Sequence, residues 1–262
     1  MGRLQFLGTA AAVPAPGRES ASYLIDDGIL IDLGWNVTER LRALGHDPCA
    51  IHTLILTHGH HDHYLGLPQF LFYRQMRPGN AKAPLRVIGP AEDLARILES
   101  AWAFLQYGEH GHRFAQPEAI ALEALQPGDS FAVGGYAVRT ARGIHPVPAL
   151  CYRFESNESA LVVCSDTAYH PPLADFARGA RVLIHEASFG PKEAPESNPY
   201  GHSGAAQAAR IAQMAQVESL YLVHLADADR PAALAAARAH FANTQLGVDG
   251  ETVAWTRGPS TS

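Results

Sequence analysis

Thr57-His58-Gly59-His60-His61-Asp62-His63 places four histidines and one aspartate directly after a β-like run, Thr53–Thr57. A helical pattern begins a few residues later, near Pro68, and proline is a good first helical residue. A solvated histidine-rich loop or an expression tag would be the simpler explanation. A tag, however, does not sit between a strand and a helix inside a chain. The stretch therefore indicates a metal site at the end of a strand.

The spacing of these side chains predicts two adjacent metal ions. Residues two apart in an extended segment face the same way, so His58 and His60 can bind one ion. The turn before the helix can aim Asp62 and His63 at a second ion. Imidazole suits zinc, iron or manganese, and a carboxylate adds a hard oxygen ligand. These ligands alone do not choose among the three metals.

The composition is typical of a globular protein. The 262 residues are 47% hydrophobic and 18% charged, enough for one large domain with a buried core. We find no apolar run that could span a membrane and no signal-peptide core. A net charge of −6 argues against non-specific nucleic-acid binding. Three widely spaced cysteines (Cys49, Cys151 and Cys164) predict reduced thiols in a cytoplasmic protein.

β-like runs and helical patterns follow one another along the chain. The expected strands are Leu4–Gly8, Ser22–Ile25, Ile29–Asp32, Thr53–Thr57, Leu85–Ile88, Phe131–Val133, Tyr136–Thr140, Leu150–Glu155, Ala160–Ser165, Val182–Glu186 and Leu220–His224. The expected helices are Val37–Leu44, Pro68–Gln75, Ala91–Tyr107, Ser203–Gln216 and Pro231–Asn243. This order predicts layered sheets with helices outside. Gln106–Gln116 breaks the rhythm, as either a surface loop or a substrate lid.

The metal motif also carries a family resemblance. His58-x-His60-x-Asp62-His63 matches the H-x-H-x-D-H signature, so the chain resembles the metallo-β-lactamase superfamily. The resemblance implies an α/β fold, a four-layer αββα sandwich with metals at one edge of its two sheets. It also implies a single hydrolase domain over residues 1–262.

The resemblance predicts three further ligands, in chain order. His145 follows the run Tyr136–Thr140, whereas Asp166 and His224 each end a strand. Taken alone, His145 could be a loop residue beside prolines, and Asp166 could cap a turn. Within the ordered pattern, both are expected to bind metal.

The resemblance also assigns each ligand to an ion. One ion is expected on His58, His60 and His145, the other on Asp62, His63 and His224, and Asp166 is expected to bridge them. Two divalent ions about 3.5–4 Å apart can hold a bridging hydroxide and polarise a phosphoryl or carbonyl oxygen. Asp62 can also orient that nucleophile. We expect zinc, with manganese or iron as alternatives.

Other segments narrow the resemblance to the ribonuclease Z branch. Phe6-Leu7-Gly8-Thr9 is similar to its first strand, and Ile184-His185-Glu186-Ala187-Ser188-Phe189 to its H-E-A-T segment. The segment from Tyr200 to Ala209 resembles its G-H-S-T helix start. Val248-Asp249-Gly250-Glu251 resembles its closing strand. The resemblance therefore covers essentially the whole chain.

These motifs predict an acid beside the metals. Ser203 would cap the helix that follows it and leave His202 facing the cleft. An imidazole there can donate a proton to a leaving alkoxide, and Glu186 could hold its tautomer. The alternative is that His202 packs structurally between strand and helix. We expect His185 to be a buried strand residue.

One departure from the branch bears on the substrate. Short-form ribonuclease Z enzymes carry a tRNA-gripping arm between the positions of His145 and Asp166. Here that interval is only Pro146–Ser165 and is filled by two expected strands. No cluster of lysine and arginine elsewhere replaces the arm. We therefore expect no stable nucleic-acid partner.

The leading hypothesis is a dinuclear-metal phosphodiesterase acting on a small phosphodiester or nucleotide-like substrate. Hydrolysis of a lactone, carboxylic ester or aryl sulfate ester is the alternative within the same chemistry. A metal-binding module without turnover is the alternative from another class. We expect no membrane partner and a homodimer, since Phe70-Leu71-Phe72-Tyr73 could serve a core or a dimer face.

Overall fold

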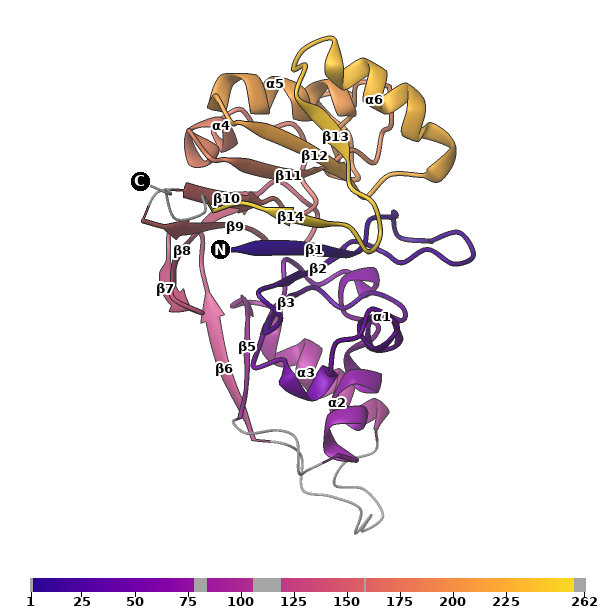
Figure 1. Ribbon diagram of the computed structural model, residues 1–262, viewed down its shortest axis with the longest axis vertical. Helices are drawn as coiled ribbons and strands as arrows, with labels where there is room; N and C mark the ends of the chain where they lie inside the picture. The colour runs from indigo at the N-terminus through magenta and orange to yellow at the C-terminus, as the bar shows by residue number, and fades with distance from the viewer. Residues whose placement is uncertain (1, 78–83, 106–118, 158, 257–262) are drawn as a thin grey trace, which may run out of the picture.

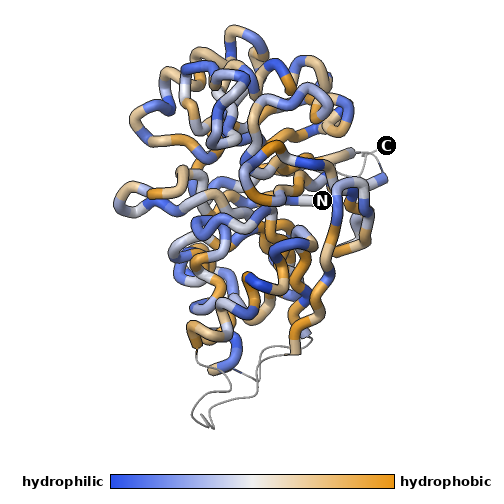
Figure 2. The backbone as a smooth tube through the Cα atoms, turned by 180° about the vertical axis from the view of Figure 1, so that it is seen from behind, coloured by the Kyte–Doolittle hydropathy of each residue, from blue (hydrophilic) through white to orange (hydrophobic). Residues whose placement is uncertain are grey.

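Two seven-stranded β-sheets face each other in the middle of the molecule, with helices on their outer sides (Figure 1). The computed structural model describes residues 2–77, 84–105, 119–157 and 159–256. The expected four-layer αββα sandwich is confirmed. Along the chain, apolar stretches alternate with hydrophilic turns (Figure 2). Within the described residues, no helix is both long and apolar enough to cross a membrane.

The first sheet has the strand order β14-β1-β2-β3-β4-β5-β6. Its strands are β1 (Arg3–Gly8), β2 (Ser22–Ile25), β3 (Ile29–Ile31), β4 (Thr53–Ile55), β5 (Leu85–Pro90), β6 (Ile120–Leu125) and β14 (Thr252–Ala254). The hairpin strands at one side pair antiparallel, whereas β3, β4, β5 and β6 run parallel. Parallel strands bring their carboxyl ends to one edge of the sheet.

The second sheet has the order β13-β12-β11-β10-β9-β8-β7. Its strands are β7 (Ser130–Val133), β8 (Tyr136–Gly143), β9 (Ala149–Ser156), β10 (Ser159–Val163), β11 (Val182–Glu186), β12 (Ser219–Val223) and β13 (Thr244–Leu246). The first four strands form an antiparallel meander, and β10 to β13 run parallel. The hairpin between β9 and β10 occupies the interval where a tRNA-binding arm would begin.

Helices seal the outer face of each sheet. The first sheet is covered by α1 (Val37–Ala43), α2 (Leu67–Gln75) and α3 (Leu94–Phe104), and the second by α4 (Leu173–Ala177), α5 (Ala205–Ala215) and α6 (Arg230–Arg238). The described residues also form the short 3₁₀ helices η1 (Pro48–Ala50), η2 (His61–His63) and η3 (Asp227–Asp229). A third apolar layer, between the sheets, contains large side chains such as Phe6, Tyr152 and Trp255. Burial of these three layers stabilises the fold and holds the strand ends in place.

Several helix boundaries differ from those expected. The helix expected over Ala91–Tyr107 is α3, which begins only at Leu94. The helix expected to extend to Asn243 ends at Arg238, whose Nε donates to the carbonyl oxygen of Thr244 at the start of β13. The hydrophobic pattern alone therefore extended both helices beyond their observed bounds.

The expected cap at Ser203 is wrong. Helix α5 begins at Ala205 with Gly204 as its N-cap, and the Gln207 side chain accepts from the Gly204 backbone N–H at 2.8 Å. The Ser203 hydroxyl instead donates to the Thr167 carbonyl oxygen at 2.8 Å. A serine cannot cap the helix while its hydroxyl is used to tie two loops together.

One α-helix and three strands of the structure were not predicted from the sequence. Helix α4 and strands β6, β13 and β14 were not expected, because each is brief or lacks a clear apolar period. The closing strand is β14, so Val248–Glu251 lies in the turn before it. Gln106–Gln116, expected as a surface loop or lid, lies outside the described residues.

The apolar run on α2 serves mainly the core. Phe70 and Leu71 are buried under the first sheet, whereas Phe72 is 52% exposed. The homodimer therefore stays a prediction. Cys49, Cys151 and Cys164 are buried and free, as expected, and the cytoplasmic location predicted from them stays untested.

Candidate metal centre

The parallel strands deliver the predicted ligands to one edge of the sandwich. His58 follows β4, Asp166 follows β10 and His224 follows β12, each just beyond the carboxyl end of its strand. In open sheets of this kind, ligands bind outside the carboxyl ends of the strands. The expected strands Thr53–Thr57 and Leu220–His224 end early, at Ile55 and Val223, because the backbone turns there toward the site.

Turns carry the remaining predicted ligands. The short helix η2 contains Asp62 and His63, with His60 immediately before it. His145 lies in the turn between β8 and β9. An isolated β-bridge between His58 and Ala149 draws that turn against the metal motif. All seven predicted ligands are therefore brought together from both sheets.

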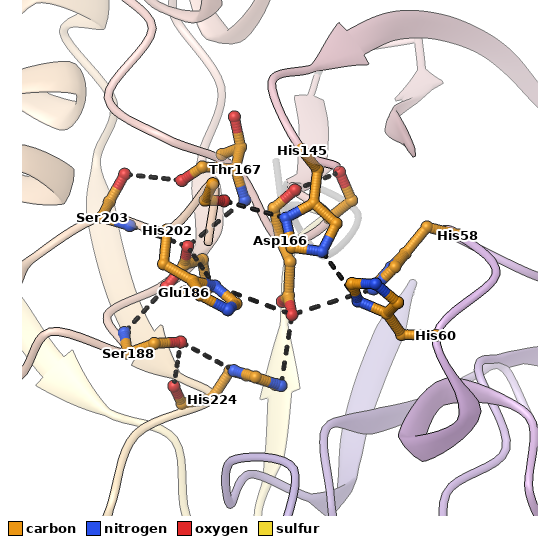
Figure 3. A network of polar contacts seen from close by, with 12 residues as sticks. His58, His60, His145, Asp166, Thr167, Glu186, Ser188, His202, Ser203 and His224 are labelled. Carbon is orange, nitrogen blue, oxygen red and sulfur yellow. Dashed lines mark hydrogen bonds and ion pairs between the residues drawn. The ribbon is translucent and has the colours of Figure 1, made fainter. Parts of the chain in front are cut away.

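The seven side chains form two neighbouring groups. The first cluster is His58, His60 and His145, and the second cluster is Asp62, His63 and His224. Within each cluster the ligand atoms lie within 4.8 Å of one another. Asp166 lies between them, with its Oδ2 3.9 Å from His58 Nε2 of the first cluster and 3.3 Å from His224 Nε2 of the second. Figure 3 shows its carboxylate between His58 and His60 on one side and His202 and His224 on the other.

Hydrogen bonds at Nδ1 define the tautomers of His58 and His145 in the first cluster. The Thr57 hydroxyl donates to Asp32, so it accepts from Nδ1 of His58 at 3.0 Å. Nδ1 of His145 donates to the Gly201 carbonyl oxygen at 2.9 Å, since a carbonyl can only accept. Each ring therefore presents the lone pair of Nε2 to the centre.

The second cluster is arranged in the same way by different groups. Nδ1 of His63 donates to the Asp32 carboxylate at 2.8 Å. The Ser188 hydroxyl donates to the His224 carbonyl oxygen at 2.9 Å and accepts from Nδ1 of that ring at 2.8 Å. Here too the Nε2 lone pairs face inward.

Two inward-facing atoms show that the residues fit a metal ion. Nε2 of His58 and Nε2 of His63 are buried and have no hydrogen-bond partner among the described residues. A buried polar atom without a partner is costly, and a bound cation would remove that cost. His60 Nδ1 lies 2.9 Å from His145 Nε2, so these two atoms converge as well.

The buried charge also fits a cation. Asp32, Asp62 and Asp166 are at most 4% exposed, and their ion-pair partners in the described parts of the chain are histidines. Burial disfavours the charge on Asp166, but the nearby His224 and His63 outweigh it and lower its pKa well below the usual value. Buried carboxylates without lysine or arginine are typical of metal sites.

The imidazoles of the two clusters differ in basicity. Burial, with His63 nearby, lowers the pKa of His58 well below its usual value, and burial also lowers the pKa of His60 and His145. At His63 burial acts in the same direction, but the carboxylates of Asp166 and Asp32 outweigh it and raise the pKa well above normal. A metal ion bound at His63 would therefore compete with a proton.

His202 and Glu186 lie beside the clusters as expected. Nδ1 of His202 donates to Glu186 Oε1 at 3.1 Å and lies 3.8 Å from Asp166 Oδ2. The Glu186 carboxylate is buried and also accepts from the backbone N–H groups of Thr167, Ser188 and Ser203. Burial lowers the pKa of His202, but its hydrogen bond to Glu186 and the charge of that carboxylate outweigh this and raise it.

His185 takes no part in the site. It is buried in β11, as expected, and its Nδ1 donates to the Glu186 carbonyl oxygen at 2.8 Å.

Sequence reasoning missed Asp32 and Ser188, the residues behind the second cluster. Asp32 directly follows β3, the parallel neighbour of β4, and that adjacency was the available signal. Asp32 and His224 both have left-handed backbone, with φ of 57° and 51°. Such conformations are uncommon outside glycine and concentrate at functional sites.

Comparison with known proteins gives the family. Residues 28–225 match the model of the β-lactamase superfamily domain. Ribonuclease Z of Mycobacterium sp. (strain KMS) is 30% identical over 233 residues, covering 83% of this chain and 82% of the relative.

Solved structures share the fold. The metallo-β-lactamase fold protein YhfI of Bacillus subtilis superposes with a TM-score of 0.80 at 22% identity, covering 96% of this chain and 98% of that protein. A diphosphatase of the PhnP family superposes with a TM-score of 0.75 at 21% identity, covering 98% of each chain. Given the sequence matches and this site, the chain belongs to the β-lactamase superfamily and is a metal-dependent hydrolase of its ribonuclease Z-like group.

Proposed function

We propose that the protein is a phosphodiesterase that hydrolyses a small phosphodiester or nucleotide-like substrate, with residues 1–262 forming one hydrolase domain. The observation that carries the proposal is the pair of His202 and Glu186 beside the predicted metal ligands. A simple metal-binding module has no use for an oriented, partly exposed imidazole at this position.

His202 has the geometry of a general acid. Glu186 engages its Nδ1, which leaves Nε2 as the atom that can meet a substrate. The side chain is 20% exposed, so a substrate can reach it, whereas Glu186 is almost fully covered. The alkoxide leaving group of a phosphodiester is a strong base, and protonation by a positioned acid typically contributes about 10²–10⁴-fold to the rate.

The predicted ligands would hold two divalent ions, for which we propose zinc. One ion would bind the first cluster, the other the second cluster, and Asp166 would bridge them. When bound, the ions would supply an activated water and offset charge on the phosphoryl group. Asp62, placed 3.3 Å from Nε2 of both His63 and His224, would also orient the attacking water.

The relatives support a substrate that is cleaved at phosphorus, and the hairpin of β9 and β10 supports a small substrate. The mycobacterial relative is a ribonuclease, an enzyme of RNA phosphodiesters, and one structural neighbour is a diphosphatase. The strands β9 and β10 fill the interval between His145 and Asp166, which leaves no length for an arm that grips tRNA.

The test compares leaving groups in zinc-loaded protein. Bis(p-nitrophenyl) phosphate releases a weakly basic phenolate, whereas a nucleoside alkyl phosphodiester releases a strongly basic alkoxide. We expect His202→Ala to reduce kcat/KM by about 10²–10⁴-fold for the alkyl diester. The loss for the p-nitrophenyl diester should be smaller. His52→Ala is the matched control, because His52 is exposed and lies outside the site.

Two outcomes would contradict the proposal. Equal losses for both diesters would remove the acid role from His202. No turnover of either diester, with metal content verified, would exclude a phosphodiesterase and favour lactones, carboxylic esters or aryl sulfates.

A further inference from the structure

A pocket opens beside His145, where the two sheets separate at the metal edge. Its walls come from the carboxyl ends of β5 and β6 and from the β8–β9 turn, and include Pro90, Glu92, Leu125, Arg142 and Pro148. Its volume is about 170 Å³, roughly ten times what one water molecule needs. A ligand bound at the first cluster can therefore extend into this space through the His145 side.

Arg142 lies on the face of β8 that is turned toward the first sheet. Side chains alternate along a strand, so Arg142 shares a face with Val138 and Thr140, both buried. It also pairs directly with Leu150 of β9, whose side chain belongs to the core between the sheets. An arginine at an inward position is costly to bury, and this one remains exposed because the sandwich opens at this point.

The charges of the pocket are not used by the fold. In the described parts of the chain, neither Arg142 nor Glu92 forms an ion pair. Arg139 lies three residues earlier on the same strand and is also exposed, but its Nη2 lies 2.7 Å from Glu155 Oε1. Arg142 is therefore available to a ligand, and Arg139 is not.

We propose that this pocket binds the part of the substrate that lies beyond the scissile diester, and that Arg142 recognises a second phosphate there. A guanidinium presents paired N–H donors that match phosphate oxygens. Glu92 would repel a purely anionic group but accepts hydrogen bonds from hydroxyl groups. A phosphorylated sugar offers both features, so the preferred substrate is a phosphodiester of a phosphorylated sugar or nucleotide. This inference rests on the proposed phosphodiesterase function.

Two chromogenic substrates that differ in one phosphate test the proposal. These are uridine 5′-(p-nitrophenyl phosphate) and its 3′-phosphorylated form. Zinc-loaded wild-type protein should have the higher kcat/KM for the phosphorylated substrate. Arg142→Gln should lower the ratio of the two kcat/KM values by about 10–100-fold, the range for a lost charge-assisted contact. Arg139→Gln, on the outward face of β8, should leave the ratio unchanged.

The outcomes separate this proposal from the proposed function. A wild-type ratio near one, or equal changes for both substrates in Arg142→Gln, would overturn the pocket while leaving the phosphodiesterase in place. If neither substrate is hydrolysed with metal bound, the proposed phosphodiesterase function is wrong. Ligand binding measured by calorimetry then tests the phosphate-binding role of the pocket. In that case uridine 3′,5′-bisphosphate should still bind wild-type protein more tightly than uridine 5′-phosphate, with the difference lost in Arg142→Gln. No such difference would end the proposal.

Discussion

The two ligand clusters use the same residue type in opposite surroundings. The first cluster consists of imidazoles only, and its His60 and His145 are partly open to solvent. The second cluster includes a carboxylate and is buried throughout. The pKa shifts follow this difference, since burial lowers the pKa of His58, whereas Asp166 and Asp32 raise that of His63 against the effect of burial.

The groups behind the clusters differ as well. In the first cluster, neutral groups engage the rings, namely the Thr57 hydroxyl and the Gly201 carbonyl oxygen. In the second, a full negative charge on Asp32 lies 2.8 Å from Nδ1 of His63. A carboxylate behind a histidine makes the ring a stronger ligand. The second cluster should therefore hold a cation more firmly, and the first cluster, which is partly open to solvent, should face the substrate.

Removal of metal should have the largest effect. Dialysis against a chelator should abolish hydrolysis. The metal content per chain should fall in two steps, and the ion of the first cluster should leave first. A ligand at 100 times its Kd contributes about 2.7 kcal/mol of stability, so Tm should fall by roughly 5–10 °C. Elemental analysis measures the metal content per chain and calorimetry measures Tm. Added zinc should restore the metal content, Tm and hydrolysis. Loss of both ions in a single step would contradict the expected difference in metal affinity between the two clusters.

Asp32→Asn should have the next largest effect, and it should weaken the second cluster more than the first, because Asp32 contacts His63 directly but reaches His58 only through the Thr57 hydroxyl. Asparagine tolerates the left-handed backbone at this position but cannot accept as a carboxylate does from Nδ1 of His63. We expect metal affinity at one of two sites to fall by about 10–100-fold. Metal titration followed by elemental analysis would show this as one ion per chain. Asp27→Asn is the control, because Asp27 is exposed in a turn. Equal weakening of both sites would contradict the distinction.

Ser188→Ala should have the smallest effect. It removes both neutral hydrogen bonds of the Ser188 hydroxyl, one to Nδ1 and one to the carbonyl oxygen of His224, and leaves the ligand itself intact. A bond of this kind is worth about 0.5–1.5 kcal/mol, which corresponds to a loss of roughly 2–10-fold in zinc affinity. Competition with a chromogenic chelator measures it, with Ser100→Ala on the exposed side of α3 as control. An effect as large as that of Asp32→Asn would mean that charge is not what distinguishes the clusters.

The structure brings the predicted ligands together at one edge, and their binding of metal stays a prediction. The histidines and aspartate of residues 57–63 lie within one turn of chain, and their spacing alone brings them to one place. His145, Asp166 and His224 were found through the order of a family pattern, and the structure brings them to that same edge. Prediction failed for β6, which is as long as β1 but has no regular alternation of buried and exposed side chains, and for the three-residue strands β13 and β14.

From the sequence alone came the candidate side chains of the site and their order along the chain, because strand period and metal-ligand spacing are properties of neighbouring residues. Only the tertiary structure decided which groups support them. Asp32 contacts His63, which lies 31 residues away in the sequence, and Asp62 contacts His224, which lies 162 residues away. Arg142 lines a pocket whose other wall belongs to the first sheet. Such contacts depend on the packing of two sheets against each other, and no local pattern encodes that packing.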